Sequence, residues 1–322
     1  MSSTLHALLA GVLDYAGLFP PARLPLHEAI KRYARYRDDP ASWMLGRFVC
    51  PAEQLGELTP LLSLLPSSAS PLAISVLGRG GKSASEFLAG LRVDVEAMSA
   101  FRDRHGDSVA MAVLEVRLPS DVLAPGATED AHKLLEDSAK AIEDSRLPTL
   151  TLYYEAVPGI PWRAWVTRLR MALTEDAGRS PSAGCKLRCG GLEATAFPSP
   201  EQIAAAIVAC RDAGVPMKFT AGLHHPLRHF DVSLQTYMHG FLNVFAAGVL
   251  AYARRLGAEA VQHILEDVNL ENFAFEDARF RWKDYPASIP EIEQARRSAV
   301  ISFGSCSFEE PRDDLRAMRL LK

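Results

Sequence analysis

The sequence is poor in cysteine, with five cysteines among 322 residues. An odd number of cysteines in a chain of this length does not fit a disulfide framework, which small secreted domains use in place of a large core. Hydrophobic residues make up 48% of the chain, enough to build a core without cross-links. We therefore expect reduced thiols at Cys50, Cys185, Cys189, Cys210 and Cys306.

Long apolar runs are also missing. The longest, Phe241–Ala253, is interrupted by Asn243 and is too short to cross a bilayer as a helix. No lysine or arginine precedes the short apolar run Ala7–Ala10, which argues against a secretory signal peptide. These observations predict a cytoplasmic protein that has no membrane partner.

The charge shows no excess of one sign. The formal net charge is -4, and acidic and basic residues are interspersed along the chain. Proteins that bind nucleic acids usually concentrate basic residues on one surface, so no nucleic-acid partner is expected. A small anionic substrate would have to be held by a few local cations.

Short β-like runs alternate with amphipathic helical stretches. The runs are mostly apolar, as expected for strands that are covered on both faces. Their alternation with helices implies parallel strands and right-handed crossovers, and eight of them predict an α/β fold, a (β/α)8 TIM-type barrel. An open doubly wound sheet is the alternative, although no Gly-x-Gly-x-x-Gly turn follows an early strand. The predicted strands are Leu13–Ala16, Arg47–Cys50, Leu72–Leu77, Val109–Leu118, Thr149–Ala156, Cys185–Cys189, Met217–Thr220 and Ala299–Phe303.

The clearest helical pattern is Pro200–Gly214. Ser199 can cap its start, proline suits the first helical position, and glycine suits its end. Further helices are predicted at Glu86–His105, Thr128–Asp144 and Pro161–Asp176.

Residues 231–297 separate the last two predicted strands by far more than one crossover helix needs. Two helices are predicted there, Gly240–Arg255 and Gly257–Val268, followed by the aromatic and charged stretch Phe273–Pro286. We interpret this region as an elaboration of the βα unit before the last strand, within a single barrel domain spanning residues 1–322. Packing is the favoured role, and a lid or a contact of a homo-oligomer is the alternative.

Two predicted strands carry the same pattern, Lys-x-x-x-Gly, at Lys186–Gly190 and Lys218–Gly222. Alternate residues of a strand share a face, so Arg188 points the same way as Lys186. Two adjacent lysines repel, which lowers a lysine pKa and favours the neutral amine that forms a Schiff base with a carbonyl. The same cations could instead bind a carboxylate or phosphate, or each lysine could simply extend to solvent.

Three acids interrupt apolar segments: Asp14, Glu115 and Glu155. A charge inside a strand is costly unless it is paired, and these acids can balance the lysines across the barrel. We predict that Glu115 and Glu155 are catalytic and move protons, and that Asp14 binds substrate. The alternative is a structural pairing of each acid with an arginine such as Arg117 or Arg47.

The densest polar cluster is His224-His225-Pro226-Leu227-Arg228-His229, directly after a predicted strand. Adjacent histidines on an extended chain point apart, so a metal ion shared by His224 and His225 is not favoured. We predict acid–base catalysis by His224, substrate binding by His225 and Arg228, and no metal or other cofactor.

The segment Ser302–Ser307 follows the last predicted strand. Small residues with free backbone amides can form a nest for anions, and barrels often place a phosphate site there. Gly304, Ser305 and Ser307 are therefore predicted to bind an anionic group of the substrate. Cys306 as a nucleophile is a less favoured alternative, because the sequence offers it no obvious partner.

Together these segments resemble the deoxyribose-phosphate aldolase family of class I aldolases. In that family the sixth strand carries the Schiff-base lysine in a Lys-x-x-x-Gly motif, the seventh carries a second lysine, and the eighth ends in a phosphate loop. Lys186–Gly190, Lys218–Gly222 and Phe303–Ser307 are similar to these motifs, and Leu13-Asp14-Tyr15 is similar to an early Asp-His-Thr segment. The resemblance implies that Lys186 is the nucleophile and that Lys218 lowers its pKa.

The sequence thus favours an aldolase-type lyase that acts on a small anionic carbonyl substrate through a lysine pair. One alternative is a metal-dependent hydrolase or lyase that uses His224, His229 and an acid such as Asp14 or Glu155. Another is a non-catalytic barrel that binds an anionic metabolite.

Overall fold

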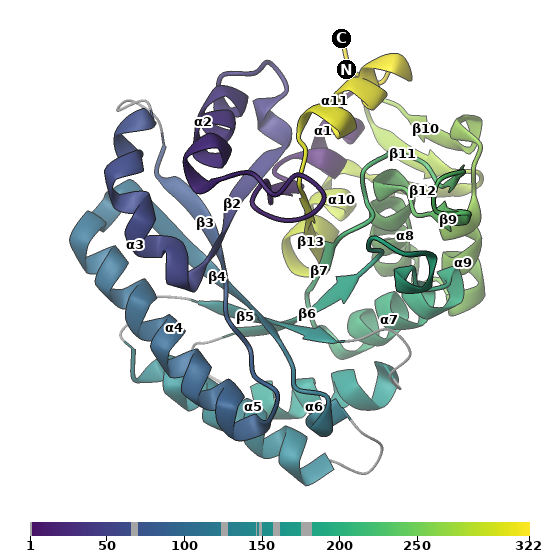
Figure 1. Cartoon of the computed structure of the whole chain (residues 1–322). Helices are drawn as coiled ribbons and strands as arrows, with labels where there is room; N and C mark the ends of the chain where they lie inside the picture. The colour runs from purple at the N-terminus through teal and green to yellow at the C-terminus, as the bar shows by residue number, and fades with distance from the viewer. Residues whose placement is uncertain are drawn as a thin grey trace.

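The computed structural model describes residues 2–65, 70–123, 128–145, 147, 150–156, 162–174 and 182–322. At its centre eight parallel strands form a closed barrel in the order β1-β13-β7-β6-β5-β4-β3-β2 (Figure 1). The barrel closes where β1 pairs with both β13 and β2, which confirms the predicted (β/α)8 TIM-type fold over the open sheet. Its strands are β1 Leu13–Tyr15, β2 Leu45–Pro51, β3 Leu72–Leu77, β4 Val109–Arg117, β5 Thr151–Ala156, β6 Ser182–Arg188, β7 Met217–Thr220 and β13 Val300–Ser305.

Every predicted strand corresponds to a strand of the barrel. β3 and β7 have the predicted bounds, and the other strands differ from the prediction by a few residues at their ends. Central apolar residues such as Leu114, Leu152, Leu187 and Phe219 are fully buried. Helices cover the outside of a parallel barrel and side chains fill its inside, so both faces of each strand leave water.

Helices surround the barrel (Figure 1). The predicted cap of α7 is present, because Ser199 and the Gln202 side chain each accept a hydrogen bond from the other's backbone amide, and Gly214 ends the helix in the left-handed conformation. The predicted ends Thr149, Pro161 and Asp176 lie outside the described residues. The helices are α1 Ser3–Leu9, α2 Leu26–Arg37, α3 Leu55–Leu58, α4 Ala84–His105, α5 Thr128–Glu143, α6 Trp162–Thr174, α7 Pro200–Ala213, α8 Phe241–Arg254, α9 Ala258–Glu266, α10 Ile289–Ser298 and α11 Glu309–Ala317.

The long segment between β7 and β13 holds the two predicted helices, α8 and α9, and also short strands that the sequence did not predict. A hairpin precedes α8, and a three-stranded antiparallel sheet packs against α1, α8 and α10. Residues 241–251 of α8 are all buried, as expected for packing. The added strands are β8 His229–Asp231, β9 Thr236–Met238, β10 Phe273–Phe275, β11 Arg279–Trp282 and β12 Tyr285–Ser288.

The asparagine that interrupts the longest apolar run joins three parts of this segment. The Asn243 amide nitrogen donates to the carbonyls of Ile264 and Asp267, at 2.8 Å and 2.7 Å, and its oxygen accepts the Arg228 amide at 2.9 Å. A fully buried polar side chain must find such partners, because an unpaired one costs free energy. Asn243 therefore fixes the end of α9 and the loop before β8 against α8.

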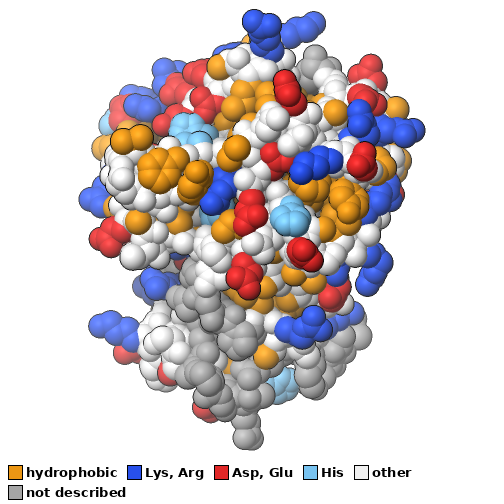
Figure 2. Space-filling model, turned by 90° about the vertical axis from the view of Figure 1, so that its right-hand side faces the viewer, with side chains coloured by type: hydrophobic (Ala, Val, Ile, Leu, Met, Phe, Trp, Pro, Cys, Tyr) orange, Lys and Arg blue, Asp and Glu red, His pale blue; other side chains and the backbone are white. Residues whose placement is uncertain are grey.

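The surface carries both signs of charge. Acidic and basic side chains are interspersed with small hydrophobic groups on the described part of the face in Figure 2. In the part of the chain that the structure describes, no helix is long and apolar enough to span a membrane. All five cysteines are free thiols, as predicted.

Candidate active site

A pocket of about 310 Å³ lies at the C-terminal end of the barrel strands, where barrel enzymes place their active sites. The loops after β1, β6, β7 and β13 form much of its wall, and side chains from the strands form its floor. The residues that line it are Ala16, Phe19, Pro20, Pro21, Val49, Leu77, Glu115, Glu155, Lys186, Arg188, Gly191, Leu192, Thr220, Ala221, Gly222, His224, Gly304 and Cys306.

Lys186 and Lys218 are joined by one carboxylate. Their Cα positions are paired in the register of β6 and β7, as the repeated motif predicted. Glu115, which lies on β4 two strands away from β6, binds the Lys186 ammonium through Oε2 at 2.7 Å and the Lys218 ammonium through Oε1. Lys186 lines the pocket, whereas Lys218 is 1% exposed and is not among the lining residues.

Glu155 forms the second contact of Lys186 and connects it to Arg188. Its Oε2 lies 2.8 Å from the Lys186 ammonium, and its Oε1 accepts a hydrogen bond from Arg188 Nε at 3.3 Å. Lys186 and Glu155 are buried, but the Arg188 side chain is 44% exposed at the pocket mouth. The lysine ammonium is therefore held between two carboxylates, and a guanidinium lies beside it.

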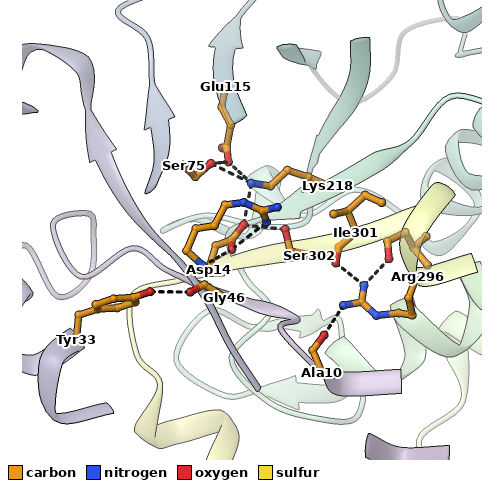
Figure 3. A network of polar contacts seen from close by, with 12 residues as sticks. Ala10, Asp14, Tyr33, Gly46, Ser75, Glu115, Lys218, Arg296, Ile301 and Ser302 are labelled. Atoms are coloured by element: carbon orange, nitrogen blue, oxygen red, sulfur yellow. Dashed lines mark hydrogen bonds and ion pairs between the residues drawn. The ribbon is translucent and has the colours of Figure 1, made fainter. Parts of the chain in front are cut away.

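Asp14 anchors the other lysine (Figure 3). Its Oδ2 lies 2.7 Å from the Lys218 ammonium and accepts the Ser302 hydroxyl at 2.7 Å, and its Oδ1 accepts the Arg47 amide at 2.7 Å. Gly46 allows this close approach, because a Cβ there would stand 2.5 Å from Asp14 Oδ1. Asp14 is fully buried and does not line the pocket, so the structure places it behind the predicted substrate site.

Ser75 completes the buried network. Its hydroxyl donates to Glu115 Oε1 at 2.6 Å and accepts from the Lys218 ammonium at 3.0 Å (Figure 3). Lys218 also lies 5.5 Å from the centre of the Tyr153 ring, a cation–π contact. With three oxygen partners and an aromatic face, this buried ammonium has the compensation that its burial requires.

The electrostatics of the pair correct one expectation. Burial opposes the charged form of Lys186, but Glu115 and Glu155 outweigh burial and raise the pKa of its ammonium. The expectation that the Lys186 pKa is lowered is therefore wrong in this structure, where the Glu115 carboxylate lies between the two ammonium groups. Burial would raise the pKa of the Glu115 and Glu155 carboxyls, but nearby positive charges outweigh burial and lower both pKa values. Lys186 has the largest such effect on each carboxyl.

The two glycines of the repeated motif are in contact. A Cβ on Gly222 would stand 2.8 Å from the Gly190 Cα, and one on Gly190 would stand 2.9 Å from the Gly222 Cα. Gly222 also has a φ of 71°, which only glycine adopts without strain. The motif therefore lets the loops after β6 and β7 approach each other at the pocket.

The histidine cluster connects the loop after β7 to the C-terminal helix α11. His224 lines the pocket and its Nδ1 lies 3.1 Å from Glu310 Oε2. His225 Nδ1 lies 2.6 Å from Asp314 Oδ2 and does not line the pocket. The Arg228 guanidinium lies over the Tyr237 ring, 4.6 Å from its centre, also outside the lining. Only His224 of the three predicted residues thus reaches the pocket wall.

The loop after β13 uses its hydroxyl groups internally. Ser305 donates to the Ser307 carbonyl at 2.8 Å, and the Ser307 hydroxyl accepts the Glu310 amide at 3.1 Å at the start of α11. Gly304 and Cys306 line the pocket, whereas Ser305 and Ser307 do not. Burial raises the pKa of the Cys306 thiol, which disfavours the thiolate that a nucleophilic cysteine needs.

The arrangement of possible metal ligands does not favour the metal-dependent hydrolase or lyase. Among the described residues, no three His, Cys, Asp or Glu side chains are grouped as metal ligands would be. The Nδ1 atom of His229 instead lies 3.1 Å from the Leu227 carbonyl, and its ring packs edge-on against His225.

Sequence reasoning missed the two serines of the network. Ser75 and Ser302 are single hydroxyl residues inside the apolar runs Leu72–Leu77 and Ala299–Phe303. A buried hydroxyl needs a partner, so a lone serine in an otherwise apolar strand indicates a polar neighbour inside the barrel. Arg47 was considered only as a structural partner, and it does contact Asp14.

A scan of the chain against protein-family models found no match, and a search of curated protein sequences found no significant similarity.

Proposed function

We propose that the protein is a carbon–carbon lyase of the aldolase type, with Lys186 as the residue that forms a Schiff base with a carbonyl substrate. The observation that carries this proposal is the position of the Lys186 ammonium, buried at the pocket floor between Glu115 and Glu155. A lysine that only balanced buried acids would not need to line a cavity, and Lys218 serves that purpose without lining it.

Glu155 is the proton acceptor in the first step. Because the pKa of Lys186 is raised, its ammonium must transfer a proton before it can attack, and Glu155 Oε2 lies 2.8 Å away at the pocket. The amine then adds to the substrate carbonyl carbon to give a carbinolamine. Glu155 returns its proton to the carbinolamine hydroxyl, water leaves, and a protonated imine forms on Lys186.

The same carboxylate then serves the cleavage step. Glu155 takes the proton of the substrate's β-hydroxyl, the bond between the α- and β-carbons breaks, and its electron pair moves to the imine nitrogen. An aldehyde leaves and an enamine remains. The α-carbon takes the proton back from Glu155, and water hydrolyses the imine to release the second product.

Lys218, Asp14, Ser75 and Ser302 act as positioning residues. Lys218 holds Glu115 in place and keeps it ionised, and Asp14 with the two serines holds Lys218. Glu115 in turn fixes the Lys186 ammonium. The resemblance of the two lysine motifs to deoxyribose-phosphate aldolases supports the same division of roles, with Lys186 as nucleophile and Lys218 as its partner.

The raised pKa of Lys186 also supports a second candidate, a non-catalytic barrel that binds an anion through permanently charged groups. The two candidates differ in what happens to the substrate's carbon–hydrogen bonds. Of the two candidates, only the enzyme would catalyse exchange of the α-hydrogens of a carbonyl compound with solvent, through its Schiff base and enamine.

The test is hydrogen–deuterium exchange at the α-carbon of small carbonyl compounds, followed by NMR in D2O. We expect exchange with the wild-type protein and none above background with Lys186→Ala. Exchange that survives in Lys186→Ala would contradict the proposal. Ligands that raise the melting temperature with no exchange for any compound would favour the binding protein.

A further inference from the structure

Lys186 and Arg188 present two positive charges next to each other in the pocket. They lie two residues apart on β6, both line the pocket, and each binds a different oxygen of the Glu155 carboxylate. Arg188 is the partly exposed one, so its guanidinium can take an additional anionic partner from solvent. A substrate carbonyl carbon at Lys186 would therefore have a guanidinium as its immediate neighbour.

The loop after β13 does not offer a comparable site for phosphate. The Ser305 and Ser307 hydroxyls bond within the loop and to the start of α11, and Glu310 of that helix lies at His224. Phosphate binding calls for several converging donors around a charge near -2. Besides Lys186, the cationic or imidazole side chains that line this pocket are Arg188 and His224.

The net charge of the ion-pair cluster matches a substrate that carries a single negative charge. Three carboxylates and four cations leave one positive charge in excess, which a carboxylate neutralises and a phosphate dianion exceeds. Arg188 helps to lower the pKa of Glu155. An anion bound to Arg188 offsets the positive charge of the guanidinium, which raises the pKa of Glu155 and makes it a better proton acceptor. The cluster consists of Asp14, Glu115, Glu155, Arg47, Lys186, Arg188 and Lys218.

The rest of the pocket wall is largely apolar. A sugar chain with several hydroxyl groups would leave many of them without partners here, whereas an apolar chain would gain from leaving water. The larger apolar side chains of the wall are Phe19, Pro20, Pro21, Val49, Leu77 and Leu192.

We propose that the carbonyl substrate is a 2-oxo acid with an apolar remainder, whose carboxylate binds Arg188 while its C2 carbon reacts with Lys186. The carboxylate must be bonded directly to the carbonyl carbon, because the two cations share one small carboxylate, Glu155. In the covalent step the ammonium and the 2-oxo group release one water and leave a protonated imine at C2. This inference rests on the proposed function of Lys186.

The test is borohydride trapping of the intact protein, measured by mass spectrometry at increasing concentrations of three carbonyl compounds. Pyruvate carries the 2-oxo acid group, methyl pyruvate lacks its charge, and dihydroxyacetone phosphate carries a phosphate. We expect an adduct with pyruvate at a half-saturating concentration about tenfold or more below those of the other two. Methyl pyruvate loses the charge-assisted hydrogen bond to Arg188, and the phosphate of dihydroxyacetone phosphate is separated from its carbonyl carbon by a methylene group and an oxygen. The 2-oxo group of methyl pyruvate is more electrophilic than that of pyruvate. A preference for pyruvate would therefore reflect binding and not intrinsic reactivity.

Arg188→Ala should raise the half-saturating pyruvate concentration about tenfold or more and should change that of methyl pyruvate much less, because only pyruvate loses a partner for its carboxylate. Arg117→Ala is the matched control, since Arg117 is exposed at the end of β4 and does not line the pocket. The wild-type comparison stands even if Arg188→Ala does not fold. Adducts that form equally well with methyl pyruvate or with the phosphate would overturn the substrate class alone, and the absence of any adduct would overturn the Schiff base as well.

Discussion

Lys186 and Lys218 are register partners on adjacent strands, yet only Lys186 lines the pocket. The same motif therefore places two lysines in different surroundings. Lys186 is held between acids at a cavity, while Lys218 is sealed within a buried network of acids and hydroxyl groups. This difference predicts that the two lysines respond differently to substitution.

Lys218→Met should reduce the free energy of unfolding by about 3–5 kcal/mol, because it leaves the Asp14 and Glu115 carboxylates buried with one cation fewer. Urea unfolding measures the change. Lys133→Met is the control, since the Lys133 side chain is 75% exposed and its loss should cost less than about 1 kcal/mol. A Lys218→Met protein as stable as the control would mean that the buried network does not form in solution.

Glu155→Gln should slow the formation of the Lys186 adduct by roughly 10²- to 10⁴-fold, because the amide cannot accept the ammonium proton. Rapid mixing with substrate followed by borohydride quenching gives this rate. Glu193→Gln serves as the comparison, because Glu193 is an exposed acid near the pocket loops that does not line the pocket. An unchanged rate in Glu155→Gln would assign the proton transfer to another group.

Gly222→Ala should destabilise the fold by about 1–3 kcal/mol and distort the pocket. The alanine would have to adopt a φ of 71° with its Cβ against the Gly190 Cα. Gly56→Ala, a helical site whose Cβ would meet no atom within 4 Å, should be neutral or slightly stabilising. Thermal melting of both variants decides this, and equal melting temperatures would contradict the tight contact between the two glycine loops.

Stability should fall in mild acid because of His239. This residue is 1% exposed, its Nε2 donates to the Pro198 carbonyl at 2.7 Å, and burial lowers its pKa to about 4. An unfolded chain binds the proton near pH 6.5, so the free energy of unfolding decreases as pH falls from 6.5 toward 4.

The loss between pH 7.5 and pH 5 should be about 2 kcal/mol from this one group. Urea unfolding of the wild type and of His239→Gln at both pH values isolates it. The free energy of unfolding of His239→Gln should fall by about 2 kcal/mol less between the two pH values than that of the wild type. An equal fall in both proteins would assign the pH sensitivity to other groups.

The sequence carried enough information to predict the barrel, because most of its strands are apolar runs and helical patterns alternate with them. The antiparallel sheet in the long segment was missed, although Arg279-Phe280-Arg281-Trp282 alternates with the period of a strand. Its strands are only three or four residues long, and such short runs give weak periodic signals.

The site was predicted in part. Lys186, Glu155, Glu115 and Arg188 meet at one pocket, because residues at the ends of parallel strands converge there. The strand pattern predicted that the acids could balance the lysines, but it did not show which acid would meet which lysine or that Glu115 would lie between the two ammonium groups. Nor could it show that Ser305 and Ser307 would turn their hydroxyls into their own loop.

The most direct test of the account is to locate the carbonyl adduct on the chain. Wild-type protein is incubated with pyruvate and borohydride, digested, and analysed by peptide mass spectrometry, with Lys186→Ala as the control. We predict one reduced adduct, on Lys186, and no adduct in the variant. An adduct on Lys218, or one that persists on other lysines in Lys186→Ala, would contradict the assignment of Lys186 as the nucleophile.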